Sequence, residues 1–271
     1  MVNSFSSIAP SAIFLASTRL NWTPLQPQFQ KRTCLQASSQ LEQLASMTTL
    51  AIDSGDLKVI EEYAKTGFIT DATTNPLFVS QVGLNSGDPI YADLVNDAVN
   101  FATSSLNKGG DNVAEIVALA IDKLSVNLGA AISKIVPGYI STEVDPRLSF
   151  DTQASVERAR RIIHLYGQMG VPRSRVLIKL AATWEGICAA EILEAEGIQC
   201  NLTLVFSFLQ AVACAQKGAH LISPFPGRIL DWYNREQPSR NGKVLTPEED
   251  EGVLACKKMF NYFKVSFWRL S

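Results

Sequence analysis

The sequence predicts an α/β fold of parallel β-α-β units in a single domain. Short apolar or β-branched runs alternate with longer helical patterns from residue 43 onward. No linker rich in Gly, Pro or Ser divides this region, and no internal repeat appears in it. The chain has 271 residues, enough for one large barrel domain, which typically uses about 250.

The expected elements follow the chain in order, with more than one helix between the second and third strands. The expected strands cover residues 48–53, 71–75, 138–145, 175–181, 200–207 and 220–225. The expected helices cover residues 56–66, 89–106, 113–128, 152–169, 183–195, 207–217 and 247–263.

The composition excludes several classes of protein. A formal net charge of -2 gives no clustered basic surface for nucleic acid or an anionic membrane. No window approaches the roughly 20 uninterrupted apolar residues that cross a bilayer. The five cysteines are widely spaced and never form a CxxC pair, so neither a disulfide framework nor a zinc site is predicted.

The first forty residues have a different composition from the rest of the chain. Residues 1–40 contain no Asp or Glu, are rich in Ser, and carry only the basic residues Arg19, Lys31 and Arg32. This profile is typical of an organellar transit peptide, here of a plastid type. We therefore expect a disordered transit peptide over 1–40 and location in the chloroplast stroma, with a plain disordered tail and the cytoplasm as the alternatives.

Polar residues alternate with apolar ones in the fifth expected strand. One face carries Asn201, Thr203, Val205 and Ser207, and the other carries Leu202, Leu204 and Phe206. We expect the large apolar set to be buried against outer helices, and the polar set to line a wet or catalytic interior.

Lys179 falls on the inner face of the fourth strand, whose outer face carries Val176, Ile178 and Leu180. A buried lysine loses hydration, which disfavours its charged form, and a neutral amine is a nucleophile toward carbonyls. The alternative is a lysine that reaches solvent or forms a structural ion pair.

Two carboxylates come from different strands: Asp53 lies at the end of the first strand and Glu143 near the end of the third. In a parallel barrel both would lie at the same rim as Lys179, where they could carry protons for imine chemistry. The alternative for Asp53 is a cap on the following helix. At the end of the sixth strand, Ser223 and Arg228 could hold a phosphate, with an ordinary surface arginine as the alternative.

Five segments resemble strand signatures of the classical transaldolases, in the order that the family has them. They are DATTNP (71–76), ISTEVD (140–145), LIKLA (177–181), CNLTLVFS (200–207) and LISPFPGRILDWY (221–233). The resemblance implies a TIM-type (α/β)8 barrel, incomplete here with about six of eight strands. It also implies a transferase of the pentose phosphate pathway that needs no cofactor and no metal.

In that reaction a Schiff base carries a dihydroxyacetone unit from sedoheptulose 7-phosphate or fructose 6-phosphate to an aldose phosphate. The resemblance implies roles for nine residues. Lys179 matches the Schiff-base lysine, Asp53 the acid/base of bond cleavage, and Glu143 a carboxylate that acts through a water held with Thr203. The matched substrate-binding residues are Thr73 and Asn75 at the dihydroxyacetone site, Ser223 and Phe225 near the intermediate, and Arg228 at the phosphate. The expected partners are sugar phosphates, with a homodimer as one assembly.

The sequence departs from the family after Lys264, where the family continues with two strand-helix units. We therefore expect a truncated barrel over 41–264 and a tail unrelated to the family over 265–271. Six strands would leave two unpaired sheet edges. The alternative functions are a non-catalytic or unstable truncated isoform, and a class I aldolase that releases the three-carbon unit to water.

Overall fold

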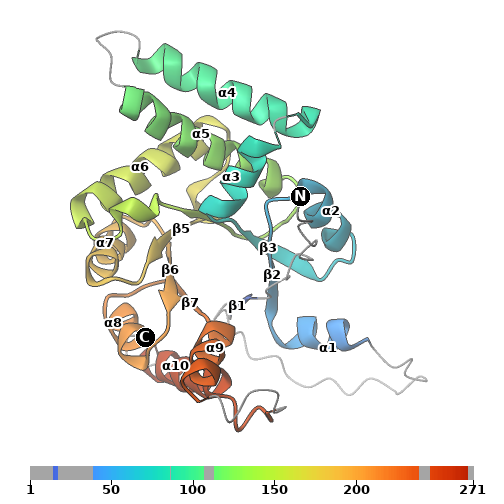
Figure 1. The fold of residues 1–271 in the computed structure, drawn as a ribbon, viewed down its shortest axis with the longest axis vertical. Coiled ribbons are helices and arrows are strands. Elements are labelled where there is room, and N and C mark those ends of the chain that lie inside the picture. The colour runs from blue at the N-terminus through green and yellow to red at the C-terminus, as the bar shows by residue number, and fades with distance from the viewer. Residues whose placement is uncertain (1–14, 18–38, 86, 107–112, 238–244, 268–271) are drawn as a thin grey trace, which may run out of the picture.

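Six parallel strands curl into the wall of an incomplete barrel, with the helices on its outside (Figure 1). The computed structural model describes residues 15–17, 39–85, 87–106, 113–237 and 245–267. The parallel strands, each paired with the next in the chain, are β2 (Thr49–Asp53), β3 (Ile69–Thr73), β4 (Ile140–Glu143), β5 (Val176–Ala181), β6 (Cys200–Val205) and β7 (Leu221–Pro224). The predicted fold class is confirmed.

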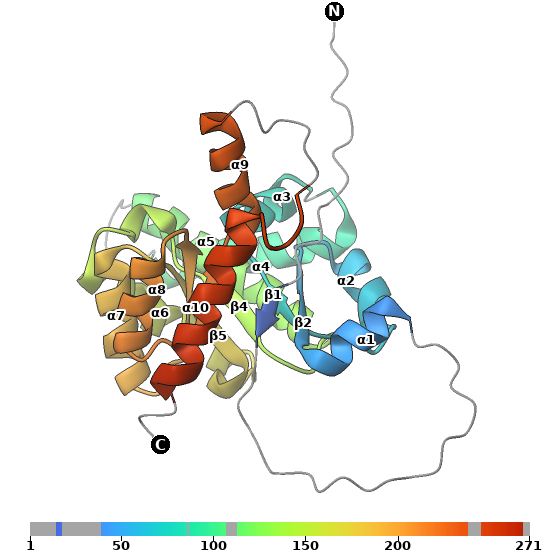
Figure 2. The same cartoon turned by 90° about the horizontal axis from the view of Figure 1, so that it is seen from below.

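The helices cover the convex side of the sheet, and α10 runs alongside α8 and α9 (Figure 2). They are α1 (Gln40–Met47), α2 (Leu57–Ala64), α3 (Pro76–Leu84), α4 (Pro89–Leu106), α5 (Val113–Ser133), α6 (Thr152–Gln168), α7 (Trp184–Ala195), α8 (Phe208–Gln216), α9 (Pro226–Glu236) and α10 (Glu251–Phe267). Two short 3-10 turns cover Pro146–Leu148 and Arg173–Arg175. Helices α1 and α3 were not among the expected elements.

A short strand, β1 (Leu15–Ser17), pairs antiparallel with β2. It lies within the segment that we expect to be a transit peptide. The remainder of that segment, apart from its last two residues, lies outside the described residues. The transit peptide therefore stays a prediction.

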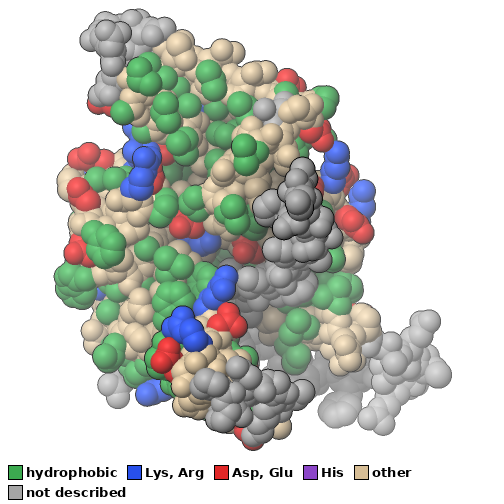
Figure 3. Space-filling view, in the orientation of Figure 1, with side chains coloured by type: hydrophobic (Ala, Val, Ile, Leu, Met, Phe, Trp, Pro, Cys, Tyr) green, Lys and Arg blue, Asp and Glu red, His purple; other side chains and the backbone are tan. Residues whose placement is uncertain are grey.

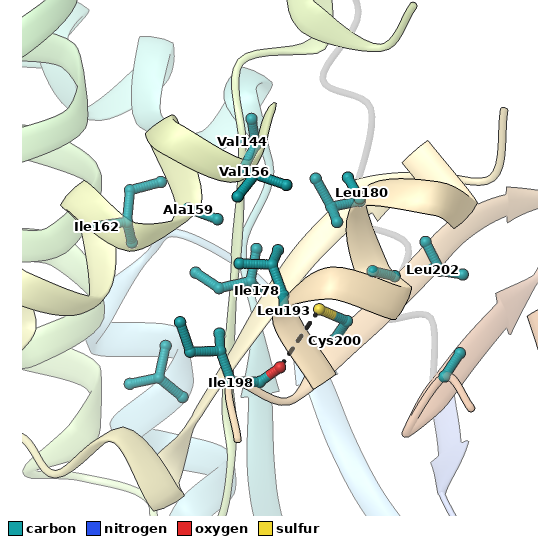
Figure 4. Packing of buried hydrophobic residues seen from close by; sticks show 14 of the residues in the cluster. Val144, Val156, Ala159, Ile162, Ile178, Leu180, Leu193, Ile198, Cys200 and Leu202 are labelled. Carbon is teal, nitrogen blue, oxygen red and sulfur yellow. Dashed lines mark hydrogen bonds between the residues drawn. The ribbon is translucent and has the colours of Figure 1, made fainter. Parts of the chain in front are cut away.

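The outer face of the sheet forms the hydrophobic core with the helices. Val176, Ile178 and Leu180 of β5 are buried there with Leu202 of β6, as the alternation in the sequence predicts (Figure 4). In the described part of the chain, α5 alone is long and apolar enough to cross a membrane. However, 61% of its most apolar window is buried, as in the core helix of a folded domain.

Helix α5 approaches α6 closely at Gly129. The phenol of Tyr166 on α6 is fully buried and lies 2.5 Å from the hydroxyl of Thr142 on β4. A Cβ atom at Gly129 would lie 1.7 Å from the Tyr166 hydroxyl oxygen. Only glycine therefore lets this buried hydrogen bond form beside α5.

We expect Gly129→Ala to lower the free energy of unfolding by about 1–3 kcal/mol, because the added methyl group overpacks a rigid site. Gly83→Ala in α3 is the matched control. A Cβ atom there meets nothing within 4 Å, and alanine should stabilise that helix by about 0.5–1 kcal/mol. Urea denaturation measures both changes. An unchanged stability for Gly129→Ala would contradict this packing.

Candidate active site

The concave side of the sheet is polar, in contrast to its apolar outer side. Of the described residues, two lysines are buried, and one of them, Lys179, lies on β5 within this interior. Figure 3 shows acidic and basic side chains close together near the centre of one face of the molecule, surrounded by hydrophobic and uncharged groups. A buried charged group needs a partner, so the surroundings of Lys179 define the candidate site.

Lys179 contacts two oxygen atoms, one on the neighbouring strand β4 and one directly after β3. Its Nζ atom lies 3.3 Å from Oε2 of Glu143, which is directly opposite on β4, and 3.3 Å from the carbonyl oxygen of Thr74. The residue is only 5% exposed, so the alternative of a lysine reaching solvent is wrong. Pairing with Glu143 holds the amine in the interior instead.

Asp53 ends β2 and faces the same interior. Burial raises the pKa of its carboxyl group, and the nearby charge of Lys179 opposes this rise. Its Oδ1 atom is buried without a hydrogen-bond partner in the described structure. The alternative role as a helix cap is wrong, because the carboxylate of Asp56 caps α2 by accepting from the Lys58 and Val59 amides.

Glu143 is a second carboxyl group with a perturbed pKa. Burial raises this pKa, the Lys179 ammonium lowers it, and the charge of Asp53 raises it further. Asp53, Glu143 and Lys179 thus influence one another electrostatically. This arrangement of two carboxyl groups around one amine can move protons to and from a substrate that the amine holds.

A hydrogen-bonded chain of side chains crosses the interior beside Lys179. The Asn201 amide nitrogen donates to Ser141 Oγ at 3.1 Å, and Ser223 Oγ donates to Asn201 Oδ1 at 2.7 Å. Asn201 lies next to Lys179 in the strand register and is fully buried. The alternation in β6 predicted that Asn201 lines the interior, but neither Asn201 nor Ser141 was given a role among the predicted site residues.

Thr203 and Thr73 lie on strands that line the interior, and both are buried. The hydroxyl of Thr203 has no hydrogen-bond partner in the described structure, so it is free to bind a water or a ligand. Thr73 lies directly opposite Asp53 in the pairing of β2 with β3. The structure therefore places both residues on strands of the candidate site.

Three of the predicted substrate residues lie further out, at the starts of helices. The Asn75 side chain caps α3 by accepting from the Phe78 amide at 3.1 Å. Phe225 precedes α9, and its ring centroid lies 5.7 Å from that of Phe206. Arg228 lies in the first turn of α9 with a side chain that is 74% exposed, 3.5 Å from Asp231.

One expectation about β6 is wrong. Leu202 is buried on the outer face, but Leu204 is 41% exposed and Phe206 is 46% exposed, and Val205 is buried in the outer core instead. The cause is a bulge, because the pairing of β6 with β7 shifts register between Thr203 and Val205. Leu204 has a φ of +61°, a left-handed conformation that costs a non-glycine residue about 1–2 kcal/mol.

A parallel α/β barrel with a buried amine beside two carboxyl groups is an arrangement suited to an enzyme that acts on carbonyl compounds. The family model for transaldolase/fructose-6-phosphate aldolase matches residues 50–269. The chain belongs to this family.

Bacterial relatives named transaldolase agree with this assignment. The chain is 51% identical over 227 residues to the transaldolase of Aeromonas salmonicida, 49% to that of Shewanella piezotolerans and 50% to that of Haemophilus influenzae. Each alignment covers 84% of this chain and 67% of the relative. The chain thus spans about two thirds of the length of these relatives.

For the acid/base role that the family resemblance implies, the raised pKa of Asp53 predicts where activity is lost on acidification. A base must be ionised, and a carboxyl group with a raised pKa becomes protonated at a higher pH than usual. The acid limb of the kcat/KM profile should therefore lie above the ordinary aspartate value of 3.8. Initial rates across pH test this, and an acid limb at or below 3.8 would contradict it.

Proposed function

We propose that the chain is a transaldolase that transfers a dihydroxyacetone unit between sugar phosphates. The observation that carries this proposal is the buried contact of 3.3 Å between Lys179 Nζ and Glu143 Oε2, with Asp53 in electrostatic reach. The names of the relatives support the reaction, and so does the general location of barrel active sites at the carboxyl ends of the strands.

The first stage forms the imine. The Lys179 amine attacks the C2 ketone of sedoheptulose 7-phosphate or fructose 6-phosphate and forms a carbinolamine. Glu143 acts through a water to supply the proton with which the C2 hydroxyl leaves as water, giving a protonated imine. The free hydroxyl of Thr203 is suited to hold this water.

The second stage breaks and remakes a carbon-carbon bond. Asp53 takes the proton of the C4 hydroxyl, the C3–C4 bond breaks, and its electron pair moves to the imine, leaving an enamine. An aldose phosphate departs. The enamine then attacks the aldehyde carbon of a second aldose phosphate, Asp53 returns the proton, and water releases the product from Lys179.

The remaining predicted residues surround this path. We assign Thr73, Asn75, Ser223 and Phe225 to the three-carbon unit. The guanidinium of Arg228 is exposed in the first turn of α9 and is suited to the substrate phosphate, because it offers paired donors beside free helix amides.

A second candidate reaction is the release of the three-carbon unit to water. The description of the matching family model names an aldolase beside the transaldolase, and both reactions share the imine and the cleavage step. Product ratios with and without an acceptor aldose phosphate distinguish them. Transfer requires the acceptor, whereas an aldolase releases free dihydroxyacetone without it.

We also propose that residues 1–40 direct the chain to the chloroplast stroma, with the cytoplasm as the alternative. The acid-free, Ser-rich composition of this segment supports the proposal. Import of the labelled full chain into isolated chloroplasts, with cleavage near residue 40, tests it. The homodimer expected from the family resemblance is tested by the mass of the purified chain in solution.

Lys179→Ala should lower transaldolase turnover by about 10⁴-fold or more, because the nucleophile of every covalent step is lost. A coupled assay with a ketose phosphate donor and an aldose phosphate acceptor measures this. Lys123→Ala is the matched control, since Lys123 is the other buried lysine of the described residues and pairs with Asp97 among the outer helices. The control should retain turnover.

Two results would contradict the proposal. Lys179→Ala with turnover within tenfold of the unchanged chain would remove the lysine from the mechanism. An unchanged chain that unfolds in one sharp transition but shows no turnover would favour the non-catalytic alternative.

A further inference from the structure

The bulge at Leu204 determines which side chains of β6 face the interior beyond Thr203. Leu202 and Val205 are both buried in the outer core, although they are three residues apart. In a regular strand residues two apart share a face, so Val205 would lie on the same side as Thr203. The left-handed residue at Leu204 turns Val205 into the outer core, so Val205 does not follow Thr203 on the interior face.

This conformation opposes the intrinsic preference of leucine, so it needs support from its surroundings. The side chain of Gln210, in the first turn of α8, supplies it. Gln210 Nε2 donates to the carbonyl oxygen of Leu204 at 3.2 Å and to that of Ala182 at 3.0 Å. These bonds tie the bulge to the end of β5, the strand of Lys179.

The other end of the same amide fixes the segment that follows the bulge. Gln210 Oε1 accepts from the backbone amides of Phe206 at 3.0 Å and Ser207 at 3.1 Å. The Ser207 hydroxyl in turn accepts from the Gln210 amide and completes a capping box. Two carbonyl oxygens and two N–H groups thus surround the side chain, which determines its orientation.

We propose that Gln210 is a positioning residue, which holds Leu204 in its left-handed conformation and so keeps Val205 off the interior face that carries Thr203. The inference rests on the proposed transaldolase reaction. It goes beyond that reaction because Gln210 contacts no reacting group.

Two substitutions of Gln210 separate its bonds to the bulge from its part in the capping box of α8. Gln210→Glu keeps an oxygen for the capping box but loses both donated hydrogen bonds, whereas Gln210→Ala loses the cap as well. We expect Gln210→Glu to lower kcat/KM about tenfold, and to lower the melting temperature by less than Gln210→Ala does, because it loses the two bonds to the bulge but keeps the cap. Gln210→Ala should lower both quantities.

Rescue by glycine is the decisive measurement. Glycine adopts a positive φ without strain, so Leu204→Gly should make the bulge independent of Gln210. The double variant Leu204→Gly/Gln210→Glu should therefore recover kcat/KM to within about threefold of the unchanged chain. A residue that acts only as a helix cap would not be rescued in this way. Full activity of Gln210→Glu, or a double variant no better than Gln210→Glu, overturns the proposal.

The control is Glu42→Ala, which breaks the other capping box, between Ser39 and Glu42 on α1. It should leave kcat/KM unchanged. An unchanged chain without turnover would reject the proposed reaction. The inference is then decided by urea unfolding of Leu204→Gly, Gln210→Glu and the double variant. Their changes in the free energy of unfolding must be non-additive. Additive changes in the free energy of unfolding overturn it.

Discussion

The contact between Lys179 and Glu143 is the constraint on which the rest of the structure depends. Two charged groups in a protein interior are stable only if each has a partner and their remaining hydrogen-bonding capacity is satisfied. Thr74 supplies a carbonyl oxygen to the amine, and Asn201 connects Ser141 and Ser223 next to it. The interior of the barrel is therefore a polar network built around one amine.

The outer side of the same strands forms the hydrophobic core, and this core, not the polar interior, stabilises the fold. Ile178 and Leu180 flank Lys179 in sequence but point into the core beneath α6 and α7, because side chains alternate along a strand. Adjacent residues of β5 thus divide between packing and chemistry. This alternation is broken at one point in β6, where the bulge at Leu204 moves Val205 from the interior face to the outer core.

Much of this arrangement could be predicted from the sequence, since alternation and parallel pairing placed Asp53, Glu143 and Lys179 at one rim. The bulge could not be predicted, because leucine has no intrinsic preference for a positive φ and only the contacts of Gln210 make it stable. Helix α3 was missed because its apolar residues surround it instead of following one face. The strand β1 depends on pairing with β2, which lies far away in the sequence.

Identification of the residue that carries a trapped substrate tests the central claim most directly. Borohydride reduction in the presence of fructose 6-phosphate should fix the three-carbon unit to the protein, and mass spectrometry of its peptides should place the added mass on Lys179. An adduct on another lysine, or equal labelling of the buried Lys123, would contradict the account.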